Sequence, residues 1–258
     1  MASHRTDAEP VLGILQLDDA DPVTYGGAVS DPGAHGVPIL TARVAGATSN
    51  RVQGDDAGVV ADYAEAARQM ERRGVSAITS NCGFAARFQR DVAAAVRVPV
   101  GLSPLLLVPL IARFLPPGGR VGILTYDASR LNDRHFTGAG WTSDQIPVAV
   151  RGIEGSPTWR ELKKPTPRPD PEQVAADVLE ILALMTERNP EVGAVVLECS
   201  VFPMARDAVA ARSGLPTYDF VSMTRFLMAG MANRSGTDRS ARPLPSTPCR
   251  SNSGRSPV

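Results

Sequence analysis

The sequence predicts an α/β protein with two pseudo-symmetric halves, each built on a parallel sheet, and an active site in the cleft between them. Two observations carry this prediction. Short apolar runs alternate with segments of helical spacing along the chain, which is typical of βαβ units and parallel strands. The chain also contains a weak internal repeat, and such self-similarity indicates two copies of one structural unit.

The individual elements follow from composition and spacing. Strands are predicted where aliphatic and β-branched residues cluster between turn residues, at 11–15, 37–40, 75–79, 121–125 and 192–197. Because Pro38 has no N–H group, the second of these is expected at a strand start or a sheet edge. Helices are predicted where strong helix formers recur at helical spacing, at 58–72, 84–96 and 172–188. Arg73 and Gly74 end the first helix.

The repeat appears at two nearby offsets. Residues 13–18 (GILQLD) match residues 122–127 (GILTYD), an offset of 109 (122 minus 13). Residues 75–78 align with 192–195 at an offset of 117, which also carries Cys82 onto Cys199. The sequence therefore predicts one domain from 10–101 plus 216–231 and a second domain from 102–215.

Three further segments have a composition of their own. Residues 1–9 are polar and are expected to form a flexible N-terminus. Residues 232–258 are rich in Arg, Ser and Pro with few large apolar residues, so they are expected to be disordered. Residues 152–171 hold five prolines and are expected to form a long loop that acts as a lid or binding loop.

Composition excludes several classes of protein. Lys plus Arg and Asp plus Glu both number 27, so neither nucleic acid nor a membrane surface is expected as a partner. No apolar run reaches 18 residues, and the polar N-terminus has no signal-peptide core, so a cytoplasmic location is expected. The three cysteines form neither a disulfide framework nor a zinc motif, and no phosphate-binding glycine loop follows a strand.

Cys82 and Cys199 are the residues that suggest chemistry. Each follows a predicted strand and precedes a predicted helix, and ligands of parallel sheets bind outside the carboxyl ends of strands. A helix N-terminus lowers the pKa of a nearby thiol, so each thiol is expected to be partly ionised near neutral pH. Two such thiols facing one α-carbon can remove a proton from one side and return it from the other. The expected reaction is racemisation of a small carboxylate.

Residues 10–231 resemble the cofactor-independent aspartate/glutamate racemase superfamily, which also includes hydantoin racemases, maleate isomerases and arylmalonate decarboxylases. The resemblance rests on segments 79–84 (TSNCGF), 198–203 (ECSVFP) and 121–125 (VGILT) with Ser129. It implies that Cys82 and Cys199 are the catalytic pair, that no cofactor or metal is needed, and that a homodimer forms. The positions it implies for substrate binding are Gln16, Asp18, Ser80, Asn81, Gly83, Thr125, Ser129 and Ser200.

The chain departs from the glutamate racemases at one point. They follow the second cysteine with a Thr-His pair, whereas Ser200 and Val201 follow it here, and no histidine of this chain replaces the missing one by position. Glu198 precedes Cys199, and its place at a strand end predicts no catalytic role by itself. A second substrate carboxylate would need a cation, and the loop residues that could supply one are Arg51, Arg160, Lys163 and Lys164.

The predicted function is therefore a cofactor-independent amino-acid racemase that uses two opposed cysteines. Two alternatives stay open. One is a maleate isomerase-like or arylmalonate decarboxylase-like enzyme of the same superfamily, and retention of both cysteines argues against the one-cysteine decarboxylase. The other is a catalytically silent protein that binds a small carboxylate, which the missing histidine leaves open.

Overall fold

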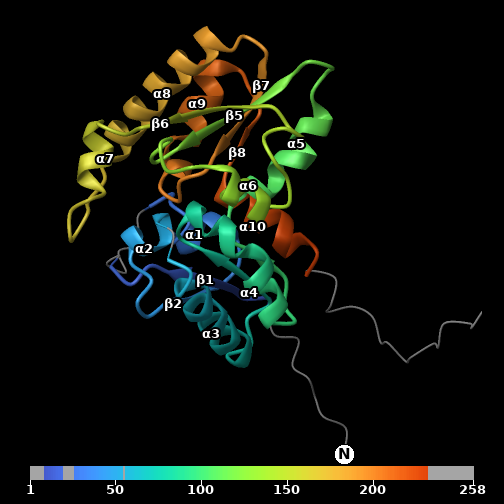
Figure 1. The fold of residues 1–258 in the computed structure, drawn as a ribbon. Coiled ribbons are helices and arrows are strands. Elements are labelled where there is room, and N and C mark those ends of the chain that lie inside the picture. Colours follow the sequence, from blue (N-terminus) through green and yellow to red (C-terminus); the bar gives the residue numbers. More distant parts are fainter. Residues whose placement is uncertain (1–8, 20–25, 55, 232–258) are drawn as a thin grey trace, which may run out of the picture.

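The computed structural model describes residues 9–19, 26–54 and 56–231 (Figure 1). Residues 1–8 and the tail 232–258, for which flexibility and disorder are predicted, lie outside the described residues. The described chain forms two four-stranded sheets, one in each half of the molecule, with strand orders β2-β1-β3-β4 and β6-β5-β7-β8. All their strand pairs are parallel, so the predicted α/β architecture with two parallel-sheet halves is confirmed.

The first sheet consists of β1 (Leu12–Gln16), β2 (Ile39–Arg43), β3 (Ala77–Ser80) and β4 (Val100–Gly101). Its central strands β1 and β3 are fully buried, as expected when helices cover both faces of a parallel sheet. The flanking helices are α1 (Pro32–His35), α2 (Ser49–Gln53), α3 (Val59–Arg72), the 3-10 helix η1 (Gly83–Phe88) and α4 (Gln89–Ala95). Helix α3 buries Tyr63, Ala67 and Met70, the apolar stripe that predicted it.

The second sheet consists of β5 (Arg120–Thr125), β6 (Val148–Gly152), β7 (Val192–Leu197) and β8 (Thr217–Tyr218). The helices that follow β4 in the chain are the 3-10 helix η2 (Pro104–Leu107), α5 (Val108–Phe114), α6 (Asp133–Gly138), α7 (Pro157–Glu161), α8 (Pro171–Arg188), the 3-10 helix η3 (Phe202–Ala205), α9 (Arg206–Ser213) and α10 (Phe220–Ala229). The predicted helix 84–96 is divided between η1 and α4, and the predicted loop 152–171 contains the short helix α7.

The internal repeat is visible in the register of the strands. Leu15 of β1 pairs with Ser80 of β3, and the equivalent residues Leu124 and Leu197 pair in the second sheet. Moving β4 by 117 residues along the chain gives β8. Each half therefore places its cysteine at the equivalent point, Cys82 just beyond the carboxyl end of β3 and Cys199 just beyond that of β7.

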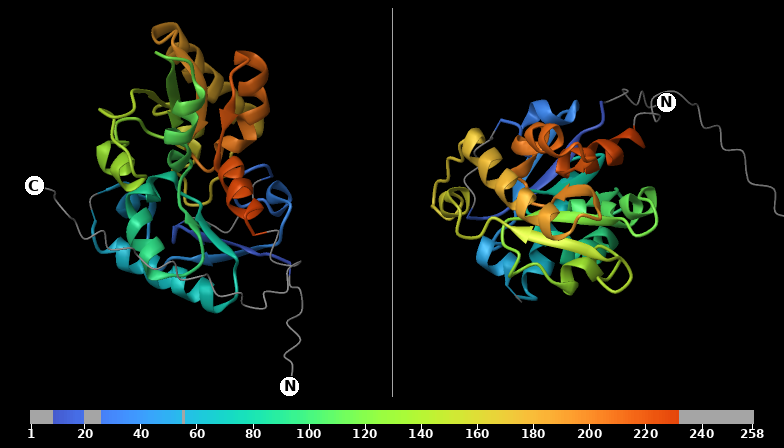
Figure 2. Two further views of the ribbon diagram at one scale, coloured as in Figure 1. Left: turned by 90° about the vertical axis from the view of Figure 1, so that its right-hand side faces the viewer. Right: turned by 90° about the horizontal axis from the view of Figure 1, so that it is seen from above.

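The last helix crosses back to the first half. Met228 of α10 packs with Leu12, Ile14 and Ala77 of the first sheet, and Figure 2 shows α10 beside the blue N-terminal elements. Strand β8 still pairs with β7, and the chain passes to the first half after Tyr218. The predicted domain bounds stay a prediction. The chain crosses between the halves twice. Helix α5 follows β4 of the first sheet and packs on β5 of the second, and α10 follows β8 of the second sheet and packs on β3 and β4 of the first.

Candidate active site

A cavity of about 670 Å³ lies at the carboxyl ends of the two sheets. Both halves line it, and both Cys82 and Cys199 belong to its wall. Its volume is in the range typical of small-molecule sites, and its position follows the rule that parallel sheets bind ligands beyond their strand ends. The predicted cleft with one cysteine from each half is therefore present.

Each thiol lies against the turn that follows it. The backbone N–H groups of Phe84 and Ala85 point at the sulfur of Cys82, and those of Ser200, Val201 and Phe202 point at the sulfur of Cys199. Cys82 is buried and Cys199 half-buried, and neither forms a disulfide. The negative charges of the two thiolates would repel each other, because each lies within electrostatic range of the other.

The expectation that these thiols are ionised near neutral pH is wrong. Burial raises the pKa of Cys199 to about 12 and raises the pKa of Cys82 still further. The N–H groups of the following turns lower both pKa values, but desolvation of the charged form outweighs them. Short 3-10 helices, not long α-helices, follow both cysteines, so the helix dipole on which the expectation rested is small.

Glu198 is the site residue that sequence reasoning missed. Its side chain is 0% exposed and lines the cavity beside Cys199. The Thr125 hydroxyl donates to its Oε2 at 2.7 Å, while Oε1 has no hydrogen-bond partner among the described residues. Burial raises the pKa of Glu198 to about 7, and the bond from Thr125 opposes this shift. A carboxyl group that titrates near neutral pH therefore lies in the wall of the cavity.

Gly83 makes the close approach of the two halves possible. A Cβ atom at Gly83 would lie 2.1 Å from Oε1 of Glu198 and 2.3 Å from its backbone oxygen. No side chain other than hydrogen fits there without movement of the backbone. The turn that carries Cys82 thus packs directly on the turn that carries Cys199, and the Glu198 carboxyl lies at their contact.

The structure places the predicted binding residues in two groups. Gln16, Asn81, Gly83 and Ser200 line the cavity with the two cysteines. Asp18, Ser80, Thr125 and Ser129 are not among the residues that line it. The substrate contacts predicted for all eight residues stay predictions.

The second group makes bonds that shape the site. The hydroxyl of Ser80 donates to the carbonyl oxygens of Cys82 and Leu102, each at 2.9 Å, which fixes the turn at the first cysteine. The hydroxyl of Ser129 donates to Asp127, a cavity residue, at 2.5 Å. Asp18 accepts from the backbone N–H of Gly46 at 2.8 Å, and Thr125 bonds Glu198 as described above.

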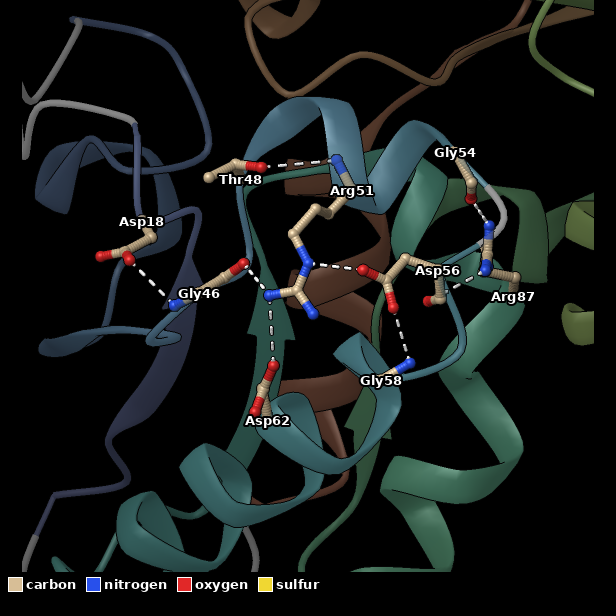
Figure 3. A network of polar contacts seen from close by, with 9 residues as sticks. All are labelled: Asp18, Gly46, Thr48, Arg51, Gly54, Asp56, Gly58, Asp62 and Arg87. Atoms are coloured by element: carbon tan, nitrogen blue, oxygen red, sulfur yellow. Dashed lines mark hydrogen bonds and ion pairs between the residues drawn. The ribbon is translucent and has the colours of Figure 1, made fainter.

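Arg51, one of the four candidate cations, is committed to a network outside the cavity (Figure 3). Its guanidinium lies 2.6 Å from Asp56 and 3.6 Å from Asp62, and it donates to the carbonyl oxygen of Gly46. These bonds hold the segment from β2 to α3 in place. That segment includes α2, which contributes Ser49, Asn50 and Gln53 to the cavity wall.

Three other cations do line the cavity. Lys163 and Lys164 lie in the predicted lid segment, together with Pro165 and Pro167, whereas Arg160 is not part of the wall and donates to the carbonyl of Gly155. Arg130, which sequence reasoning did not select, also lines the cavity, with Nε 3.6 Å from Asp127. The wall therefore offers positive charge for a substrate carboxylate.

Two features are absent from the described residues. Within 9–19, 26–54 and 56–231, no group of three or more His, Cys, Asp and Glu side chains is arranged to hold a metal ion. No helix in the same ranges combines the length and apolar character needed to cross a membrane.

Comparison with solved structures decides the fold family. Allantoin racemase from Pseudomonas fluorescens matches 91% of this chain and 99% of its own with a TM-score of 0.58 at 16% sequence identity. Unliganded arylmalonate decarboxylase matches 90% and 96%, with a TM-score of 0.55 at 18% identity. The chain has the fold of the aspartate/glutamate/hydantoin racemase superfamily. The fold that the cysteine segments led us to expect is thereby confirmed, and no family model matches the sequence.

The curated relatives found by sequence are named for another activity. A dimethylsulfoniopropionate lyase from Durusdinium sp. clade D is 26% identical over 231 residues, which cover 86% of this chain and 75% of the relative. Dimethylsulfoniopropionate lyase 7 of Emiliania huxleyi is 24% identical over 234 residues, covering 87% and 68%. Lyase 5 of the same organism is matched over only 35% of its length. The relatives found by sequence and by structure are enzymes, which supports an enzyme here.

Proposed function

We propose that this chain is a lyase that cleaves dimethylsulfoniopropionate by thiol-based removal of the proton α to the carboxylate. The observation that carries the proposal is the placement of Cys82, Cys199 and Glu198 on the wall of one cavity, in a chain whose sequence relatives are dimethylsulfoniopropionate lyases. The predicted racemase and the proposed lyase share their first step, because both begin with loss of the α-proton.

The reaction needs one base and a leaving group. A thiolate takes the proton from the carbon next to the carboxylate, and the electron pair of that C–H bond forms the carbon–carbon double bond. The bond between the β-carbon and the sulfonium sulfur breaks, so dimethyl sulfide leaves as a neutral molecule and acrylate remains. The atoms and charges balance without an oxidant, and the protonated thiol is the only change in the protein.

The cavity wall suits a substrate with charges of both signs. Arg130, Lys163 and Lys164 line the space and supply positive charge for the carboxylate end. Each also has a neighbour on the protein, which is Asp127 for Arg130, the ring of Trp159 for Lys163 and the carboxylate of Glu161 for Lys164. The sulfonium end is a soft cation, which aromatic faces and carboxylates attract, and Tyr126, Phe84 and Asp127 line the same space. These groups support recognition of a zwitterion a few ångströms long.

A second candidate is the amino-acid racemase that the sequence predicts. It is favoured by the two thiols at matched positions of the repeat, because elimination uses one base whereas racemisation uses two. The same observation argues against a one-cysteine decarboxylase, although the fold is shared with arylmalonate decarboxylase. The maleate isomerase-like reaction also uses a thiol, but as a nucleophile.

One set of assays separates these candidates. The purified chain is incubated with dimethylsulfoniopropionate, and headspace gas chromatography follows dimethyl sulfide while liquid chromatography follows acrylate. In parallel, aspartate, glutamate, neutral amino acids, hydantoins and maleate are incubated in deuterated water and examined for label at the α-carbon. The Cys82→Ala/Cys199→Ala double variant measures the background elimination.

The lyase predicts equal amounts of dimethyl sulfide and acrylate, well above the double-variant background. Deuterium in an amino acid without dimethyl sulfide would replace the lyase by a racemase. Conversion of maleate to fumarate alone would identify the isomerase. Absence of every product, together with calorimetric binding of a carboxylate, would identify the silent binding protein.

A further inference from the structure

The carboxyl of Glu198 occupies a position that ordinary packing does not explain. A fully buried carboxylate normally has its oxygens satisfied by hydrogen bonds, because an unpaired charge is costly to desolvate. Here Thr125 satisfies Oε2, but Oε1 has no partner among the described residues. The carboxyl nevertheless lies in the wall of the cavity, at the contact between the two cysteine turns.

The charge of this carboxyl affects the pKa of both thiols. Its negative charge raises the pKa of Cys82 and that of Cys199, which places it within electrostatic reach of both sulfurs. Glu198 directly precedes Cys199 in the chain, which keeps the carboxyl beside that cysteine. Because Gly83 has no side chain, the carboxyl can also approach the turn that carries Cys82. Among the described residues, Glu198 is the carboxyl whose charge raises the pKa of both thiols.

We infer that Glu198 accepts the proton of a cavity thiol and thereby generates the thiolate that removes the substrate's α-proton. The inference rests on the proposed function for the identity of the substrate. In the resting site the thiol is protonated and Glu198 is ionised. The S–H proton moves to the carboxylate, the thiolate then takes the α-proton, and Glu198 releases its proton to water after acrylate and dimethyl sulfide leave. Glu198 acts through the thiol and does not touch the substrate.

The protonation behaviour of Glu198 agrees with this task. A pKa of about 7 lets the carboxyl gain and lose a proton near neutral pH, which is where a proton acceptor works best. The Thr125 hydroxyl donates a hydrogen bond to this carboxyl, and the charge of the carboxyl raises the pKa of both thiols. The other titratable side chains on the wall of the same cavity are Asp19, Tyr126, Asp127, Arg130, Lys163 and Lys164.

The decisive variant is Glu198→Gln, which keeps the size of the side chain and an oxygen that can accept from Thr125. Turnover with dimethylsulfoniopropionate is expected to fall about 100-fold, the lower end of the range for lost general acid–base catalysis. Alkylation of the thiols by iodoacetamide is expected to become faster at fixed pH, because the charge that raises their pKa values is gone. A purely structural role would not make the thiols more reactive while turnover is lost.

Two further variants complete the design. Glu191→Gln is the matched control, since Glu191 precedes β7 at the end opposite Glu198, in a half-buried ion pair with Arg120. It is expected to leave turnover and alkylation unchanged. Thr125→Val keeps the Glu198 carboxyl but removes the hydroxyl that donates to it and lowers its pKa. The inflection in the pH profile of kcat/KM is therefore expected to shift to higher pH, while activity is retained. This variant tests the inference even where Glu198→Gln fails to fold.

The possible outcomes separate the inference from the proposed function. Turnover within threefold of the unsubstituted protein in Glu198→Gln, or alkylation that slows together with turnover, would overturn the inference while leaving the lyase intact. If the chain forms no dimethyl sulfide, the pH dependence of alkylation still tests whether Glu198 exchanges a proton with the thiols. An inflection near pH 7 that Glu198→Gln abolishes and Glu191→Gln retains would support proton exchange between Glu198 and the thiols, with the lyase assignment failing alone.

Discussion

Glu198 occupies in the second half of the molecule the position that Asn81 occupies in the first. The backbone N–H of Asn81 donates to the carbonyl of Leu15 at 2.9 Å, and that of Glu198 donates to the carbonyl of Leu124 at 2.8 Å. The side chain of Asn81 is neutral and accepts from the N–H of Leu17. The repeat is thus broken where an amide is replaced by an acid, so the two thiols have unequal surroundings and need not perform the same task.

The raised pKa of Glu198 predicts a specific dependence of stability on pH. Below its ordinary pKa of 4.5 the carboxyl is protonated in the folded and the unfolded chain. Between 4.5 and about 7 only the unfolded chain releases the proton, so the free energy of unfolding falls as the pH rises. The loss amounts to about 3 kcal/mol, at roughly 1.4 kcal/mol per pKa unit.

Urea unfolding of the unsubstituted chain and Glu198→Gln at pH 5, 6, 7 and 8 measures this effect. The variant is expected to gain stability relative to the unsubstituted chain as the pH rises. Titration of His35, whose pKa burial lowers, affects both proteins equally and cancels in the difference. Parallel stability curves would contradict the raised pKa.

Gly83→Ala is predicted to damage both stability and turnover. The added methyl group would meet the backbone oxygen of Glu198 at 2.3 Å, and a backbone atom cannot move aside by changing rotamer. We expect a loss of about 1–3 kcal/mol, the usual cost of overpacking, and lower activity because the two cysteine turns are forced apart. Gly26→Ala is the control, since nothing lies within 4 Å of its Cβ position. Thermal unfolding and turnover of the two variants measure the effect, and an equal response in both would disprove the close approach.

The sequence predicted the long and strongly patterned elements well. Helix α8 and strand β7 lie within a residue of their predicted bounds, because a periodic apolar stripe or an unbroken aliphatic run leaves few alternatives. Strands β4 and β8 span two residues each, too few to show a pattern. The predicted helix 84–96 begins as the 3-10 helix η1, whose packing against Glu198 depends on the other half of the chain.

The site was predicted in its outline but not in its electrostatics. The repeat brought Cys82 and Cys199 to one cavity, as expected from their positions. Their pKa values depend on burial, which a local helix-dipole argument ignores, so the predicted direction was wrong. The offset of 117 that pairs the cysteines also pairs Asn81 with Glu198, and that replacement of an amide by an acid was the available signal for the missed residue.

Arg130→Met is predicted to weaken substrate binding more than turnover. Arg130 lines the cavity and its nearest carboxylate, Asp127, lies 3.6 Å away, which leaves donors for a substrate carboxylate. Removal of one charge-assisted hydrogen bond is expected to raise KM about tenfold with little change in kcat. Arg90→Met, on α4 and outside the lining of this cavity, is the control. A fall in kcat at constant KM would place Arg130 in the chemical step instead.

Single cysteine variants distinguish one-base elimination from two-base racemisation. If the chain is a lyase, only one of the two variants Cys82→Ser and Cys199→Ser should lose formation of dimethyl sulfide. Its rate should fall about 100-fold or more. The other variant should keep a substantial part of the activity, because only one thiol removes the α-proton. A racemase would lose activity in both variants, since each enantiomer needs both thiols.

The asymmetry around Glu198 predicts which thiol matters in the lyase. The charge of Glu198 raises the pKa of both thiols, so the difference between them is one of position. Oε1, the oxygen of Glu198 without a hydrogen-bond partner among the described residues, lies against Gly83 in the turn that carries Cys82. The thiol on that turn is the better placed to pass its proton to Oε1, so Cys82→Ser is expected to be the inactive variant. Circular dichroism and thermal unfolding check that both variants fold. Full activity in Cys82→Ser with loss in Cys199→Ser would reverse the assignment and make Cys199 the base.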